Sequence, residues 1–162
     1  MTNEKLYSDI ISEKDVKSLL DLSDNDKENF LIYFMYNRLC NIPLDEMNHA
    51  QRTLYLAMKL EDACQADSLL SLSEEEEVFL ALNDMKSALD ELGAVKTAKA
   101  LEGFISLVPE NKVPEWSWFF EEERGAIIER LDGEISDYPD GLMSELYVKY
   151  ISNPGAVELL LS

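Results

Sequence analysis

The spacing of apolar residues constrains this chain most, because it follows the period of an α-helix along most of the length. The clearest stripe recurs at steps of four and three: Val78, Leu82, Met85, Leu89 and Leu92. A second stripe lies within residues 45–66: Thr53, Leu56, Leu60, Ala63 and Cys64. Neither the alternation of a β-strand nor an Asn-Gly hairpin turn stands out. The pattern therefore predicts an all-α fold.

The chain has 162 residues, a length typical of one domain with a substantial core. We expect a single helical domain over residues 1–162, a bundle of about six to eight helices. Their expected positions are about 13–22, 26–40, 45–66, 73–93, 95–108, 116–133 and 141–152. Val95, Ala98, Leu101 and Ile105 should face inward, and the apolar residues after Gly155 should dock on the body or on a second subunit.

Local signals place several helix ends. In the stretch SEEEEVF, Ser73 and Glu76 have the spacing of a capping box, and glutamates favour the positive end of a helix dipole. Gly93 follows the apolar stripe where a left-handed residue often ends a helix, and Gly133 should end the helix before it. Asp140 is a candidate N-cap for the helix over 141–152.

Acidic residues dominate the charge of the chain. The 33 acidic and 14 basic residues give a formal net charge of −19 and a sequence pI near 4.2, and both halves are acidic. Such a field repels nucleic acid and anionic membranes and attracts basic partners. Since neither a secretory signal nor a long apolar run is visible, we expect a cytoplasmic protein.

The residue types that carry catalysis are sparse. The one histidine, His49, forms Glu-x-x-His with Glu46, but a di-metal bundle uses that motif twice. A calcium loop begun at Asp24 would place Asn29 and Met35 where it needs glycine and glutamate. Neither a nucleophile elbow nor a glycine-rich phosphate loop is present. We therefore expect no catalytic residue, metal or cofactor; an enzymatic alternative would need His49 or a buried pair of carboxylates.

Two cysteines, Cys40 and Cys64, lie in apolar surroundings within expected helices. Such a pair is typical of a reduced protein with two small buried thiols.

Two groups of acidic residues are candidates for a binding surface. The first acidic cluster is Glu74, Glu75, Glu76 and Glu77. The second acidic cluster is Glu121, Glu122, Glu123, Glu129 and Asp132. Carboxylates three or four residues apart on a helix are separated by about 5–6 Å, and phosphates advance by about 3.4 Å per nucleotide along one DNA strand. Helical carboxylates can thus present a basic groove with a charge density comparable to that of DNA, although such faces are often simply solvated.

Aromatic residues suggest a different surface. Trp116 and Trp118, followed by Phe119 and Phe120, could anchor either the core or an interface with another protein. An interaction or immunity-type scaffold that uses this aromatic patch is therefore the alternative function.

Three stretches resemble a bacterial family of small helical domains named for a DNA-mimic protein. They are LDEMNHAQRTLYLAMKLE (44–61), ALDELGAVKTAKALEGF (88–104) and LMSELYVKYISNP (142–154). The likeness covers residues 44–154 and leaves 1–43 as an N-terminal helical extension. The chain departs from the family over 62–77, where the usual Asn-Gly-Gly-Phe turn is missing. The resemblance implies an all-helical fold, often dimeric, which imitates DNA on the DNA-binding face of a regulator and has no catalytic residues.

We therefore expect a non-enzymatic acidic protein that binds a basic protein partner. A DNA-binding regulator is one such partner, and a homodimer is another assembly to consider. Direct binding to nucleic acid or to a membrane is not expected.

Overall fold

The computed structural model describes residues 4–11 and 27–161, which form helices and no β-strand. The predicted all-α class is confirmed. The α-helices are α1 (Glu4–Ile10), α3 (Lys27–Leu39), α4 (His49–Ala66), α5 (Glu76–Phe79), α6 (Leu82–Glu91), α7 (Val95–Leu107), α8 (Glu122–Ser136), α9 (Met143–Ile151) and α10 (Pro154–Leu161). Short 3-10 helices are η1 (Leu44–Glu46), η2 (Leu69–Glu74) and η3 (Trp116–Phe120). The helix expected over 13–22 and the calcium loop considered at Asp24 both involve residues outside the described ranges.

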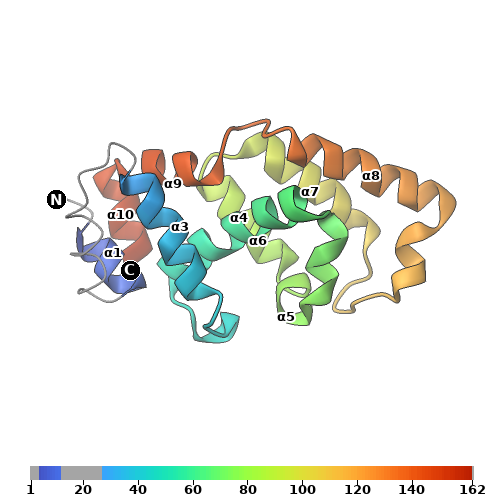
Figure 1. Cartoon of the computed structure of the whole chain (residues 1–162), viewed down its shortest axis with the longest axis horizontal. Helices are drawn as coiled ribbons and strands as arrows, with labels where there is room; N and C mark the ends of the chain where they lie inside the picture. Colours follow the sequence, from blue (N-terminus) through green and yellow to red (C-terminus); the bar gives the residue numbers. More distant parts are fainter. Residues whose placement is uncertain (1–3, 12–26, 162) are drawn as a thin grey trace.

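Helix α4 is the central element of the fold. It packs against α1, α3, α6, α8, α9, α10 and η2, and Figure 1 shows it between the two ends of an elongated molecule. The predicted stripe of Thr53, Leu56, Leu60, Ala63 and Cys64 is buried. Neighbouring residues on other faces of α4 are also buried: Leu54, Tyr55, Ala57 and Met58. A helix covered on several sides is expected to be apolar around much of its circumference.

The remaining helices gather at the two ends of the molecule. Helices α1, α3, α9 and α10 lie at one end, while α5, α7, α8 and η3 lie toward the other (Figure 1). Helix α10 follows Asn153, whose side chain accepts a hydrogen bond from the Gly155 amide, and it buries Ala156 and Leu160. Helix α10 thus docks on the body, which is one of the two predicted alternatives, while Leu159 stays 54% exposed.

The prediction of a single helix over residues 73–93 is wrong. Ser73 belongs to η2 and donates its hydroxyl to the Leu70 carbonyl at 2.6 Å, so the predicted capping box with Glu76 does not form. Helix α5 is only four residues long, and α6 begins separately at Leu82. This break turns Phe79 toward Phe104 and Phe119, each in an edge-to-face contact with ring centroids 6.2 Å apart. Packing in three dimensions therefore overrides the local helix signal.

The apolar stripe on this segment and its C-terminal end are predicted correctly. Val78, Leu82, Met85, Leu89 and Leu92 are all buried. Gly93 has a φ of 80°, and the Ala94 amide donates to the Leu89 carbonyl at 2.9 Å. This is the hydrogen bond of a Schellman ending, which favours glycine because the backbone is left-handed there.

Four other predicted helix features need correction. The segment 116–133 is divided into η3 and α8, and Gly133 lies within α8, which ends at Ser136. Val95 is 65% exposed, because it is the first residue of α7 and does not face the core. Helix α4 starts at His49 and not at about 45, and its N-cap Asn48 forms a capping box with Gln51 that was not predicted from the sequence.

The two thiols differ in their surroundings. Cys40 is exposed, contrary to the prediction, because it follows the last residue of α3 where the chain leaves the core. Cys64 is buried in α4, and burial raises the pKa of its thiol. Among the helices described, none is long and apolar enough to cross a membrane.

Candidate binding surfaces

The first acidic cluster spans the end of η2 and the start of α5. Glu74, Glu75, Glu76 and Glu77 are all exposed. Glu75 forms an ion pair with Lys59 of α4, and Glu77 accepts a hydrogen bond from the Asp45 amide at 3.2 Å. Glu74 and Glu76 have no ion-pair partner within residues 4–11 and 27–161, so their charges are directed to solvent.

The second acidic cluster follows the start and the middle of α8. Glu121, Glu122, Glu123 and Glu129 are exposed, and Asp132 is half-buried. Glu121 pairs with Arg124 at 2.6 Å. The carboxylate of Asp132 accepts a hydrogen bond from the Leu69 amide at 2.7 Å, which holds the start of η2 beside α8. Asp132 is thus a structural residue, whereas the four glutamates face outward.

Other carboxylates are also used inside the fold. Glu61 accepts a hydrogen bond from the Met143 amide at the start of α9 (3.0 Å). Asp140 accepts one from the Thr97 amide and one from the Thr97 hydroxyl, at 2.7 and 2.8 Å. The prediction that Asp140 caps the helix after it is wrong, since it caps α7 instead. Each carboxylate satisfies a free amide at a helix N-terminus, where negative charge also favours the helix dipole.

The aromatic residues of η3 divide into buried and exposed members. Phe119 is buried, whereas Trp116 is 54% and Phe120 58% exposed, with their ring centroids 5.4 Å apart. Trp118 is half-buried beneath the Arg124 guanidinium, which lies 3.9 Å from the ring centroid. Within the aromatic set considered as an interface, Trp116 and Phe120 are therefore the accessible members, and Trp116 is more accessible than Trp118.

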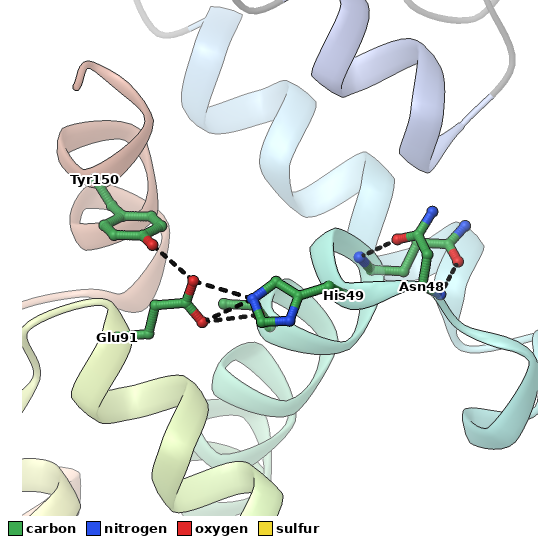
Figure 2. Close-up of polar contacts among 6 residues, drawn as sticks. Asn48, His49, Glu91 and Tyr150 are labelled. Carbon is green, nitrogen blue, oxygen red and sulfur yellow. Dashed lines mark hydrogen bonds and ion pairs between the residues drawn. The ribbon is translucent and has the colours of Figure 1, made fainter. Parts of the chain in front are cut away.

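His49 belongs to a polar cluster that joins three helices. Its Nε2 atom lies 3.0 Å from the Glu91 carboxylate on α6, and Tyr150 of α9 donates its hydroxyl to the same carboxylate at 2.6 Å (Figure 2). Burial and the hydrogen bond to Glu91 both raise the pKa of Tyr150. The histidine side chain is half exposed at the first position of α4.

Hydroxyl groups around His49 form hydrogen bonds within the fold, and that of Thr53 donates to the Glu91 carboxylate at 3.4 Å. His49 and Glu91 line a shallow pocket of about 120 Å³ together with Ser87. The Ser87 hydroxyl donates to the Asn83 carbonyl at 3.1 Å, within its own helix. The observed hydrogen bonds therefore connect α4, α6 and α9. Their role in holding these helices together accounts for the polar residues around His49.

The match to a family model covers residues 45–153, and the family is that of DMP19-like proteins. The chain belongs to the DMP19-like protein family. This is a DNA-mimic protein family, so the resemblance noted in the sequence is confirmed. No curated protein and no solved structure matches the chain. The matched range runs from η1 to α9 and contains both acidic clusters and the aromatic residues of η3, whereas α1, α3 and α10 lie outside it.

Proposed function

We propose that this DMP19-like protein is a non-enzymatic DNA mimic that binds a basic protein partner through its exposed carboxylates. The observation that carries the proposal is the display of charge: eight of the nine carboxylates in the two acidic clusters are exposed. A net charge of −19 makes the field around the whole molecule negative, which attracts the basic face of a DNA-binding protein.

The residues best placed for this role are those without an internal task. Glu74, Glu76, Glu122 and Glu123 are exposed and have no ion-pair partner in the described part of the chain. Their charges are not neutralised by neighbouring cations, so they remain available to lysine and arginine side chains that would otherwise contact phosphates. A regulator occupied in this way would be displaced from DNA without any chemical step.

Capture from an extract of the source cell tests the proposal. The immobilised protein should retain a basic protein at low salt and release it as salt rises, because ions screen the attraction. A variant with Glu74, Glu76, Glu122 and Glu123 changed to Gln should lose that protein. A control variant with the exposed residues Glu102, Glu110, Glu145 and Glu158 changed to Gln removes equal charge elsewhere and should retain it. Retention by both variants, or the lack of any salt-sensitive basic partner, would count against the proposal.

An interaction scaffold that relies on the aromatic patch is the second candidate. The adjacent, half-exposed rings of Trp116 and Phe120 favour it, since large aromatic side chains often dominate binding energy at interfaces. In that case Trp116→Ala would abolish capture, and the four Glu→Gln changes would leave it intact.

A further inference from the structure

A groove next to the second acidic cluster combines an apolar floor with an acidic rim. It lies between η2, η3 and α8 and has a volume of about 460 Å³. The apolar lining residues are Leu70, Phe119, Phe120, Ala126 and Ile128. The acidic lining residues are Glu122, Glu129 and Asp132. A surface that only imitated the phosphates of DNA would need no such apolar floor.

The walls of the groove are held in place by specific contacts. Asp132 fixes the start of η2 through the Leu69 amide, at 2.7 Å. Gly125 of α8 lies against η3, where a Cβ atom would be 3.4 Å from the Phe119 carbonyl oxygen, an ordinary van der Waals contact. The buried Phe119 ring packs edge-to-face on Phe79, with centroids 6.2 Å apart. Phe119 and Ile128 in the floor therefore belong to the folded core, whereas Phe120 and Ala126 are exposed at its surface.

The rim carries negative charge that the protein does not neutralise. Glu122 and Glu129 are exposed and form no ion pair with any residue the structure describes. The nearby Arg124 is turned away, since it pairs with Glu121 and donates to the Trp118 carbonyl at 2.9 Å. Glu122 and Glu129 are seven residues apart on α8, so they lie on the same side of the helix and about 10 Å apart along its axis.

We propose that this groove binds the apolar face of a basic amphipathic helix on the partner protein. A leucine-sized side chain would contact Phe120 and Leu70, while lysine or arginine residues two turns apart would meet Glu122 and Glu129. This inference rests on the proposed function and adds the chemistry of the partner. A second copy of the chain fits the groove less well, because each copy carries a charge of −19 and the two would repel each other.

Two synthetic peptides of equal composition test the groove. In the first, lysines two turns apart flank leucines on one helical face; in the second, the same leucines are scattered around the helix. Both tryptophans of the chain lie next to the groove: the ring centroids of Trp116 and Phe120 are 5.4 Å apart, and those of Trp118 and Phe119 are 5.3 Å apart. A change in intrinsic tryptophan fluorescence should therefore accompany binding of a peptide in the groove. We expect the amphipathic peptide to bind about tenfold more tightly than the scattered one.

Variants locate the binding to the groove. Phe120→Ala should weaken binding of the amphipathic peptide about tenfold. Tyr33 is an exposed aromatic residue on α3, and Tyr33→Ala should not affect this binding. Ala126→Gln adds bulk at an exposed position that lines the groove and should weaken binding too, whereas Ala66→Gln, at an exposed position of α4, should not. Because these positions are exposed, the substitutions should leave the fold intact.

The outcomes separate this inference from the proposed function. If both peptides bound equally and Phe120→Ala did not change their affinity, the groove would not be the binding site. Recognition by charge alone would then account for the binding. Failure of both peptides to bind would overturn the groove as a site for a basic helix, whereas the proposed function is decided by the capture experiment. The free protein could instead associate with itself, and Phe120→Ala could abolish this association. That result would show that a second copy of the chain occupies the groove, and it would overturn the assignment to a basic helix.

Discussion

Individual carboxylates in this protein have different tasks, which their residue type alone does not reveal. Asp132 and Asp140 hold helix N-termini, although the amides they bind are 63 and 43 positions away in the chain. Glu122 and Glu129, which belong to the same helix as Asp132, face solvent instead. The sequence predicted an acidic exterior from charge alone. It did not distinguish structural from exposed carboxylates, because the distant amides become neighbours only in the fold.

Glu61 provides a prediction about pH. Burial raises the pKa of this carboxyl, and the hydrogen bond from Met143, which lowers it, does not fully compensate. Ionisation therefore costs stability at pH values above the folded pKa, and this cost disappears below the unfolded pKa of about 4.3. Glu61→Gln keeps an oxygen acceptor for Met143 and removes the charge. Urea unfolding at several pH values should show the variant gaining stability relative to the wild type as pH rises from about 4; a difference that stays constant with pH would contradict this account.

Tyr147 provides a second prediction for a single residue. Its side chain is fully buried, and its hydroxyl has no hydrogen-bond partner among the residues described. Tyr147→Phe removes an unsatisfied polar group, so the free energy of unfolding should rise by about 1 kcal/mol. Tyr150→Phe, in contrast, removes the 2.6 Å hydrogen bond to Glu91 and should lower the free energy of unfolding. Chemical denaturation measures both changes, and a clear loss of stability in Tyr147→Phe would show that its hydroxyl has a favourable partner.

At the scale of helices, apolar periodicity predicted which residues are buried better than where helices begin and end. The stripes on α4 and on the segment 78–92 are buried as expected, because each needs only a regular repeat facing one core. The break between α5 and α6 was missed. It depends on η2, whose position is fixed by Asp132 of α8, and on the aromatic contacts of Phe79. Neither contact is visible in the local sequence.

The N-terminus of α7 gives a prediction at the same scale. Asp140→Ala removes the carboxylate that accepts hydrogen bonds from the amide and the hydroxyl of Thr97. The free energy of unfolding should fall by about 0.5–2 kcal/mol, the usual range for the loss of a helix cap. The exposed Asp137 supplies a matched control, because Asp137→Ala makes the same change in charge nearby. If the two variants were equally stable in urea, the hydrogen bonds to Thr97 would not support α7.

Across the whole molecule, the candidate surfaces could be predicted only in part. Net charge pointed to the two acidic clusters, and the aromatic run pointed to η3. The groove could not be found in this way, because Leu70 and Ile128 reach it from distant parts of the chain, η2 and α8. Its position beside exposed glutamates gives the molecule a surface that combines charge with apolar contact. Attraction by charge should bring a basic partner close, and shape should then select it.

Displacement of proteins from DNA tests the central claim most directly. Proteins from an extract of the source cell are bound to immobilised double-stranded DNA at low salt and then treated with this protein. If exposed carboxylates imitate phosphates, the wild type should release a specific basic protein, while the variant with Glu74, Glu76, Glu122 and Glu123 changed to Gln should not. If the wild type released nothing, or the neutralised variant released the same protein equally well, recognition by DNA mimicry would be contradicted.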